Sequence, residues 1–330
     1  MVRGGPLRVQ LIYKSEQRVA PLTDCVERLY DLGIRLECSQ AKTEVNAELS
    51  RTDADLTLVQ HEVAGGWVDK RCVIFETIDG PHLASRRLLP QVAGIVKPWL
   101  PVPRDLLNHY AWRHHCVLIR GACGQADDTC VIESPPKPIT FEKLHLAHSY
   151  VASRRLEILR ETPVDFDAER PVPCMFFGTV KYGGHEVDLH RGLALKVVLQ
   201  CGGEGGGGRK LKFPEHTALL RRTRCAVSPW GFGPICWRDY EAMLCGSIVV
   251  KPDTSFVETW PEVFIPGKTY IPCRIDFADL PAIVKDVTEN WSNYMAMRVR
   301  ARTLAVQAGD RGLIAQRWHD ILSQYGGTNE

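Results

Sequence analysis

Two glycines, an arginine and a glutamate have the types and spacing best suited to chemistry on a phosphorylated ligand. Gly231 and Gly233 predict a tight backbone turn, and such a turn at a helix start leaves N–H groups that favour a phosphate or diphosphate. Arg238 and Glu241 follow on one face of a helix expected to begin at Pro234, whose missing N–H suits a first helical position. A guanidinium matches phosphate oxygens with two parallel hydrogen bonds, and a carboxylate accepts hydrogen bonds from sugar hydroxyls. The spacing therefore predicts a ligand that carries both a phosphate or diphosphate and sugar hydroxyls. The alternative is an ordinary helix–strand unit with a surface Arg–Glu pair.

The segment from 228 to 260 resembles the donor site of glycosyltransferases with the two-domain GT-B fold, most closely the exostosin-like pattern. In that pattern a glycine turn precedes Arg-x-x-Glu-Ala, a later glycine and an apolar strand, which correspond here to Arg238, Glu241 and Gly246. The run Glu-Ala-Met-x-x-Gly also resembles the glycogen-synthase-like families, in which the glutamate holds the ribose of a nucleotide. Those relatives carry a further glutamate just before the turn, where this chain has Trp230, so inverting and retaining stereochemistry both stay open.

The resemblance implies an α/β fold of two facing Rossmann-like domains, with a C-terminal helix that crosses back to the first domain. A proline-rich, charged stretch before residue 174 predicts the boundary between them. We expect residues 1–165 to form the acceptor-side domain and residues 170–330 to form the domain that binds a nucleotide-sugar donor. At 330 residues the chain is long enough for two domains with separate cores.

Alternation of apolar strands with helical patterns supports the α/β class in both halves. In the first half we expect strands at 7–13, 35–38, 55–61, 72–78 and 92–97, and helices at 19–32 and 141–159. In the second half we expect strands at 174–180 and 225–228, a strand ending at Lys251, a short helix within 253–260, an edge segment at 267–273, and helices at 190–200, 214–222, 279–291 and 291–323. The glycine run at 201–208 lacks the Gly-Lys-Ser/Thr ending of a P-loop, so a flexible loop is expected there.

Residues that follow predicted strands are site candidates, because ligands bind beyond the carboxyl ends of strands in open parallel sheets. The resemblance places Gly178 and Thr179 under the donor, because the second domain of the GT-B relatives opens with an apolar strand that ends in Gly-Thr. The other donor-binding candidates are Arg191, Trp230, Gly231, Gly233, Arg238, Glu241, Lys251, Thr254 and Ser255. A basic Arg191 near a helix start is explained by a phosphate or, alternatively, by solvation of its charge. Thr254 and Ser255 have helix capping as their alternative role.

An inverting transfer to a hydroxyl needs a general base, and the first half offers candidates that follow its predicted strands. They are His61, Glu76, Asp79 and His82, of which Asp79 is our single choice. No motif distinguishes them, so a surface or capping role is the alternative for each.

Composition and charge indicate which partners and which cellular compartment to expect. A net charge of +2 gives no reason to expect nucleic acid, and no apolar run reaches the about 20 residues of a transmembrane helix. The N-terminus does not resemble a signal peptide, and most of the twelve cysteines lie in apolar patterns, so we expect a soluble cytoplasmic protein with reduced thiols. Cys116, Cys123 and Cys130 lack the close pairing of zinc ligands, and no metal is expected.

The residues and the resemblance together indicate a metal-independent glycosyltransferase that moves a hexose or pentose from a nucleotide-diphosphate sugar to the hydroxyl of a sugar or other acceptor. The glycine turn and Arg238, with Lys251 or Arg191, would neutralise the leaving diphosphate. No cofactor is expected, because the nucleotide sugar is a co-substrate. The alternative is a non-catalytic nucleotide- or sugar-binding module of the same fold. A dinucleotide oxidoreductase is disfavoured, because no strand–turn–helix carries G-x-G-x-x-G followed by an acid.

Overall fold

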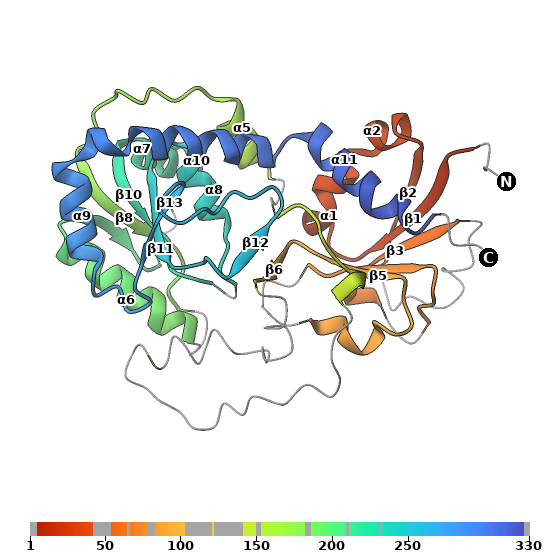
Figure 1. Cartoon of the computed structure of the whole chain (residues 1–330). Helices are drawn as coiled ribbons and strands as arrows, with labels where there is room; N and C mark the ends of the chain where they lie inside the picture. The colour runs from red at the N-terminus through yellow and green to blue at the C-terminus, as the bar shows by residue number, and fades with distance from the viewer. Residues whose placement is uncertain are drawn as a thin grey trace.

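The chain forms two lobes, each built on its own β-sheet (Figure 1). The computed structural model describes residues 5–41, 54–64, 67–77, 83–102, 121, 141–149, 153–181, 186–208, 211–231 and 233–326. All strand pairs within these two sheets are parallel. Most of their strands are short runs of buried apolar residues, as expected for parallel strands that are covered on both faces.

The first sheet has the strand order β2-β1-β3-β4-β5-β7. Its strands are β1 (Leu7–Tyr13), β2 (Ile34–Gln40), β3 (Leu56–Gln60), β4 (Cys72–Phe75), β5 (Gly94–Lys97) and β7 (Leu144–Leu146). Helices α1 (Glu16–Thr23) and α2 (Val26–Asp31) connect β1 to β2, and short 3-10 turns lie at η1 (His61–Val63), η2 (Ala84–Leu88) and η3 (Phe141–Lys143). The five strands predicted in this half are present with adjusted ends.

Two helix predictions in the first half were wrong. The helix expected at 19–32 is divided into α1 and α2, because Cys25 leaves the helical conformation (φ −106°, ψ 8°) between them. The helix expected at 141–159 is mostly absent: Leu144 pairs with Ile95 at the start of edge strand β7. Helix α5 (Arg154–Glu161) begins only where the Ser153 side chain caps the N–H of Leu156 at 3.2 Å.

The second sheet has the strand order β13-β11-β10-β8-β9. Its strands are β8 (Val172–Phe177), β9 (Glu204–Gly206), β10 (Thr223–Val227), β11 (Ile248–Pro252) and β13 (Tyr270–Cys273). The helices around it are α6 (Glu186–Gln200), α7 (Phe213–Arg222), α8 (Trp237–Leu244), α9 (Leu280–Glu289) and α10 (Met295–Ala308), with the 3-10 turn η4 (Trp291–Tyr294) before α10. The glycine run expected to be a loop contains β9. A side chain at Gly205 would crowd the Phe176 carbonyl oxygen, since a Cβ there would lie 3.1 Å from it.

Helix α8 begins at Trp237 rather than at Pro234, which corrects the predicted start. Cys236 is its N-cap residue, and the carboxylate of Asp239 accepts the backbone N–H of Cys236 at 3.0 Å. The predicted end is confirmed, because Gly246 adopts the left-handed conformation (φ +73°) directly after the C-cap residue.

The two sheets share one connection pattern. Within each, the chain makes the first strand, places the second on one side of it and the third on the other. The order therefore reverses between β1 and β3 in the first sheet and between β8 and β10 in the second. In open parallel sheets ligands bind beyond the carboxyl ends of the strands at such a switch point. The fold therefore predicts one ligand-binding position in each lobe.

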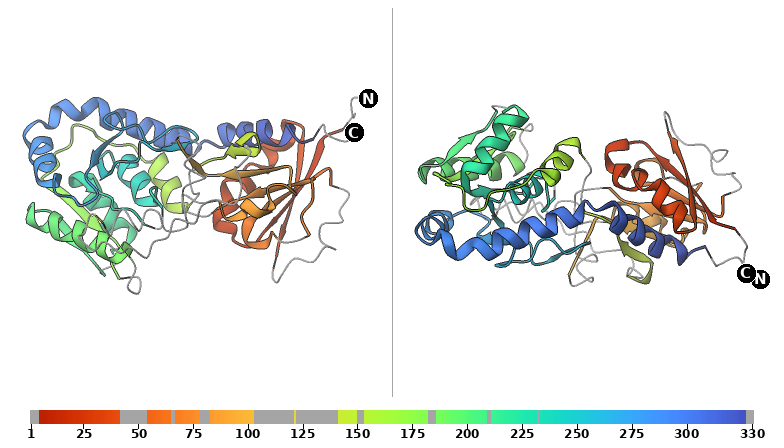
Figure 2. Two further views of the ribbon diagram at one scale, coloured as in Figure 1. Left: turned by 60° about the horizontal axis from the view of Figure 1, so that its bottom comes forward. Right: turned by 90° about the horizontal axis from the view of Figure 1, so that it is seen from above.

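The C-terminal helices and a strand pair join the lobes. Helix α11 (Arg311–Ser323) follows α10 and packs against α1 and α2, so the C-terminal helices run along both lobes (Figure 2). This confirms the crossing helix, although the long helix expected at 291–323 is broken where Asp310 caps Leu313 N–H at 2.9 Å. The strand pair consists of the antiparallel β6 (Trp99–Pro101) and β12 (Val257–Thr259). Strand β12 replaces the short helix expected within 253–260.

The predicted boundary between residues 165 and 170 stays a prediction. Helix α5 lies before it in sequence, yet Leu156 and Leu159 belong to the apolar core that also contains residues of α8 and β11. In the parts of the chain that the structure describes, no helix has both the length and the apolar character needed to cross a membrane.

Candidate functional site

Arg191 connects the two loops at the switch point of the second sheet. Its Nη1 donates to the carbonyl of Thr179, which follows β8, at 2.9 Å, and its Nε donates to the carbonyl of Trp230, which follows β10, at 3.5 Å. The residue lies on α6 and is only 7% exposed. A buried guanidinium thus fixes the spacing of two backbone loops at the place where the fold predicts a ligand.

Two glycines, Gly178 and Gly231, let the backbone approach the arginines closely. A Cβ at Gly178 would lie 2.9 Å from Nη1 of Arg238, and a Cβ at Gly231 would lie 2.9 Å from Nη2 of Arg191. The N–H of Gly231 donates to the carbonyl of Gly233 at 3.2 Å, which closes the predicted turn. A larger residue at Gly178 or Gly231 would displace a guanidinium from its present position, so glycine permits the observed placement of both arginines.

Arg238 is partly buried at the start of α8. Its Nη2 donates to the Pro229 carbonyl at 3.0 Å, and its Nε donates to the Ser228 hydroxyl at 3.4 Å. The guanidinium also lies over the Phe176 ring, 5.1 Å from the centroid, and Nη2 is 3.5 Å from the sulfur of Cys236. These contacts hold the cation beside the loop after β10 in one orientation.

Glu241 lies beside His216 of α7, a contact that the sequence did not predict. Its Oε2 is 3.8 Å from Nδ1 of His216, and burial raises the pKa of Glu241 although Arg238 and Arg155 oppose the shift. Burial, helped by the same two arginines, lowers the pKa of His216 to about 4. The imidazole is therefore neutral near pH 7. His216 was missed because no motif connects it with Glu241 in the sequence.

Lys251 is buried in an ion pair with Asp239, a residue that the sequence did not single out. Nζ of Lys251 lies 2.5 Å from Oδ2 of Asp239, and the two side chains are 1% and 0% exposed. The ammonium is also 4.7 Å from the centroid of Phe264. Since Asp239 accepts the N–H of Cys236 as well, the pair fastens the start of α8 to the end of β11. This placement gives Lys251 a role behind the loops rather than on their surface.

Thr254 and Ser255 hold the loop after β11. The N–H and the hydroxyl of Thr254 each lie 3.0 Å from the Tyr270 hydroxyl. The Ser255 N–H and hydroxyl donate to the carboxylate of Asp253 at 2.9 and 2.8 Å. Thr254 is fully buried. Ser255 and Asp253 are exposed, so of these three residues only Ser255 and Asp253 face solvent.

The switch point of the first sheet contains a polar network around Gln60. The Gln60 side-chain oxygen accepts the N–H groups of Lys14 and Ser15 at 2.7 and 2.9 Å, and its amide donates to the Thr77 hydroxyl at 3.1 Å. The Thr77 N–H donates to Nδ1 of His61 at 3.3 Å. His61 is thus held beside the loops that follow β1 and β4, and Gln60 orders these loops.

The other base candidates divide into one buried residue and two that cannot be placed. Glu76 is fully buried, 3.0 Å from Nζ of Lys97, and also accepts the N–H of Ser85. Burial alone raises the pKa of Glu76, but the Lys97 charge and the Ser85 bond outweigh burial, so the pKa lies below its usual value. The Glu76 carboxylate is therefore ionised, and both of its oxygens already have partners in Lys97 and Ser85. Asp79 and His82 lie outside the described residues.

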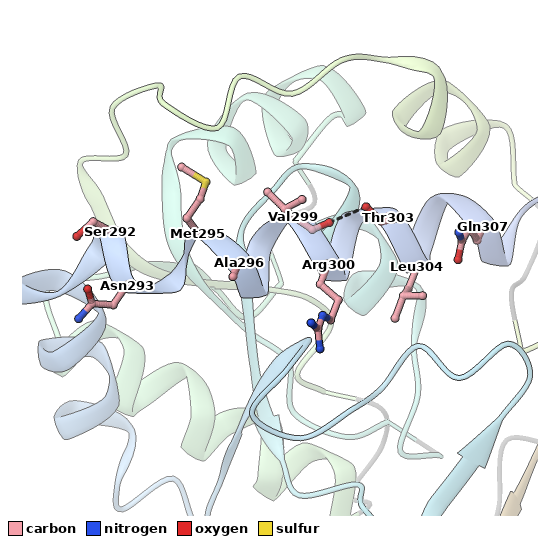
Figure 3. Close-up of a pocket in the computed structure, with 9 residues that line it drawn as sticks. All are labelled: Ser292, Asn293, Met295, Ala296, Val299, Arg300, Thr303, Leu304 and Gln307. Atoms are coloured by element: carbon pink, nitrogen blue, oxygen red, sulfur yellow. Dashed lines mark hydrogen bonds between the residues drawn. The ribbon is translucent and has the colours of Figure 1, made fainter.

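The structure brings one subset of the predicted donor residues into a single group of contacts. The residues it gathers around the β8–β10 switch point are Gly178, Thr179, Arg191, Trp230, Gly231, Gly233 and Arg238. A separate open pocket of about 720 Å³ lies along α10, lined by residues between Ser292 and Gln307 (Figure 3). None of the predicted site residues lines that pocket.

The described part of the chain also shows whether its side chains could bind a metal ion. Among the residues that the structure describes, no group of three or more His, Cys, Asp or Glu side chains is arranged to hold a metal ion. Cys116, Cys123 and Cys130 lie outside that part of the chain, so the absence of a zinc site there stays a prediction.

Comparison with known proteins supports the fold assignment. No protein-family model and no curated protein matches the sequence. A glycosyltransferase from Rickettsia africae ESF-5 matches with a TM-score of 0.54 at 9% identity, over 99% of this chain and 100% of that chain. Sucrose-phosphate synthase from Thermosynechococcus elongatus gives a TM-score of 0.41 at 12% identity, over 97% of each chain. A variant of TarM from S. aureus gives 0.47 at 12% identity, over 90% of this chain and 58% of that chain.

The Rickettsia africae structure is that of a glycosyltransferase, and its match over 99% of this chain supports the class of fold. The chain has a mixed α/β fold of two Rossmann-like domains, as the resemblance at 228–260 implied. At 9% identity the likeness concerns the fold, so the activity has to be argued from the residues.

Proposed function

We propose that this chain is a glycosyltransferase whose second domain binds a nucleotide-diphosphate sugar and whose first domain binds an acceptor hydroxyl. The observation that carries the proposal is the pair Arg191 and Arg238, each in close contact with a glycine at the β8–β10 switch point. Two guanidinium groups beside backbone loops suit a diphosphate, whose oxygens accept charge-assisted hydrogen bonds from both kinds of donor. The fold of the Rickettsia africae glycosyltransferase supports this class of reaction.

The proposed chemistry is the departure of a nucleoside diphosphate from the anomeric carbon of the sugar. Negative charge develops on the diphosphate as the bond breaks, and fixed cations aimed at that charge lower the barrier. Arg191 and Arg238 are held in place by backbone carbonyls before any ligand arrives, so little reorganisation is needed. Glu241 and His216 form a neighbouring acceptor–donor pair suited to ribose hydroxyls.

We test the donor assignment by thermal unfolding with a panel of nucleoside diphosphates and their sugars. A ligand present at about 100 times its dissociation constant adds roughly 2.7 kcal/mol to the stability of the folded state. Replacement of Arg238 by lysine should lower the affinity for the stabilising nucleotide roughly tenfold or more, because a single ammonium cannot reproduce two parallel hydrogen bonds. Arg300, which lines the pocket on α10, provides the control: Arg300→Lys should leave the affinity unchanged. Equal affinity in wild type and Arg238→Lys would remove the arginine from the donor site.

Metal independence is part of the proposal. The two arginines supply positive charge that a divalent ion would otherwise provide. Turnover should therefore persist in excess chelator. Complete loss of turnover, restored by a divalent ion, would show that a metal neutralises the leaving group.

The cytoplasm is the proposed location. The nine described cysteines are free thiols, and reduced cysteines are typical of that compartment. Thiol titration of the protein isolated under alkylating conditions checks this proposal, which predicts that these nine react after unfolding.

A further inference from the structure

The indole of Trp230 carries a buried hydrogen-bond donor that lacks a partner among the described residues. Trp230 is 4% exposed, and its Nε1 is sealed from solvent with no acceptor in reach from that part of the chain. A buried N–H without a partner costs free energy, and nearly all such groups in folded proteins are paired. The orphan N–H therefore needs an oxygen that arrives from elsewhere.

The ring is held firmly, so the N–H points in one direction. His190 meets it edge to face at 6.2 Å between ring centroids, and Phe256 does so at 5.9 Å. The backbone carbonyl of Trp230 accepts the Nε of Arg191. The guanidinium is thus on the backbone side, whereas aromatic rings surround the indole itself.

These surroundings favour a neutral oxygen over a charged one. A phosphate oxygen gains most beside the cations, which are Arg191 and Arg238 in this site. A sugar combines hydroxyl oxygens with apolar C–H faces, and an aromatic pocket wall with a single N–H donor fits that combination. Trp230 directly precedes the Gly231 turn, so the same loop would contact both the diphosphate and the sugar attached to it.

The cover over the indole belongs to a segment that the first lobe holds. The carbonyl of Phe256 accepts the N–H of Val102 at 2.8 Å, and β12 begins at the next residue and pairs with β6. Phe256 thus contacts the indole through its ring and the first lobe through its backbone.

We propose that the Trp230 indole N–H donates a hydrogen bond to a hydroxyl oxygen of the transferred sugar once the Phe256 segment has moved. This inference rests on the proposed function, because it assumes that a nucleotide sugar occupies the β8–β10 switch point. It assigns Trp230 to sugar recognition at the position where the resembling families carry a glutamate.

The test follows the indole N–H directly by nitrogen–hydrogen NMR of the full chain labelled at tryptophan. The resonance missing in Trp230→Phe identifies the residue, and Trp237→Phe, which alters a 39% exposed indole on α8, is the matched control. The probes are UDP-glucose, UDP-N-acetylglucosamine and GDP-mannose, each compared with UDP or GDP alone. A nucleotide sugar that raises the melting temperature should shift the Trp230 resonance, and its nucleoside diphosphate should leave that resonance unmoved.

Two results overturn the inference while the proposed function stands. One is a stabilising nucleotide sugar that leaves the Trp230 resonance in place; the other is an equal shift with the nucleoside diphosphate, which would assign the oxygen to phosphate. In the expected case Trp230→Phe weakens the nucleotide sugar about tenfold and leaves the nucleoside diphosphate affinity unchanged.

The ligand-free NMR spectrum of the wild type separates this inference from the proposed function. An indole N–H without an acceptor should resonate upfield of the Trp237 N–H, whose side chain is 39% exposed and bonds to water. A ligand-free Trp230 resonance downfield of Trp237 would show that a water molecule already satisfies the N–H and would overturn the inference. Failure of every nucleotide probe to raise the wild-type melting temperature would instead refute the proposed function and this inference with it.

Discussion

His61 has its proton position set by a backbone hydrogen bond. Its Nδ1 accepts the N–H of Thr77 at 3.3 Å, so the neutral imidazole carries its proton on Nε2. A ring in this tautomer presents a donor at Nε2, whereas a general base needs a lone pair there. Sequence position alone suggested a base, but the hydrogen bond favours a donor that orients an acceptor or sugar oxygen.

We therefore expect His61→Gln to keep most of the activity, within about tenfold of wild type, because the glutamine amide can place an N–H near the position of Nε2. His61→Leu should lose far more. Loss of a general base typically costs a factor of about 10² to 10⁴ in rate. Measurement of kcat/KM against pH for both variants decides the role, with His319→Gln at a partly exposed position on α11 as the control. If His61→Gln is as slow as His61→Leu and an ionisation disappears from the pH profile, His61 is a base.

At the scale of single residues the sequence identified cations and glycines better than their partners. Arg238 and Gly231 were predicted from local spacing and Gly178 from the resemblance, and the structure places them together. His216 lies on a different helix from Glu241, and nothing in a local pattern specifies a contact between two elements. Such partners depend on packing, which the sequence does not display.

At the scale of elements, the buried pair of Lys251 and Asp239 joins β11 to the start of α8. Removal of one partner leaves an uncompensated charge in a dry site, so Lys251→Met should lower the free energy of unfolding by about 3–5 kcal/mol. The double variant Asp239→Asn with Lys251→Met should recover much of that loss, since an asparagine oxygen can still accept the Cys236 N–H. Urea unfolding of the three proteins measures both effects.

The matched control is an exposed ion pair on α9. Lys285 and Glu289 lie 4.0 Å apart with side chains 74% and 60% exposed, so Lys285→Met should cost less than about 1 kcal/mol. A Lys251→Met variant as mild as this control would mean that the buried pair does not fasten α8 to the sheet.

The elements that the sequence predicted well are those with a strong local signal. Strand β11 begins with the apolar run Ile-Val-Val, and Gly246 marks the end of α8 because the left-handed conformation there favours glycine. The start of α8 was misplaced by proline at 234; Asp239, three residues after Cys236, was the capping signal that was overlooked. Edge strand β7 was taken for helix because three residues carry too little pattern.

At the scale of the whole molecule, His148 and Trp318 connect the C-terminal helix with the first lobe. The indole N–H of Trp318 donates to Nδ1 of His148 at 3.0 Å, and Phe75 packs edge to face against both rings. Burial lowers the pKa of His148 from 6.5 to about 3. The folded state therefore requires the neutral imidazole, because a protonated Nδ1 could not accept this bond.

The sign of the pH effect follows from that shift. In the unfolded chain His148 binds a proton below about pH 6.5, whereas the folded protein binds it only near pH 3. Its contribution to stability is thus complete above pH 6.5 and is lost as the pH falls toward 3, at up to about 1.4 kcal/mol per pH unit. His148→Asn keeps an acceptor for Trp318 without titrating, so its stability should fall less steeply between pH 6.5 and 4. Urea unfolding across that range measures the two slopes; parallel slopes would contradict the assignment.

The two-domain organisation was predictable because the αβ alternation restarts after a proline-rich stretch, and the resemblance at 228–260 specified the fold. The β6–β12 pair between the lobes was not, since it joins short segments about 155 residues apart in the chain. This pair and α11 determine how the lobes meet, and local sequence patterns carry no such information.

The most direct test of the account is a measurement of nucleoside diphosphate release from a panel of nucleotide sugars, with the purified chain and sugar acceptors, in the presence of chelator. We predict release that depends on the protein, is faster with an acceptor, and falls roughly tenfold or more at limiting donor in Arg238→Lys. Transfer itself is confirmed by the mass of the glycosylated acceptor. A nucleotide sugar that binds but is never consumed would contradict the glycosyltransferase assignment and leave a non-catalytic binding module of the same fold.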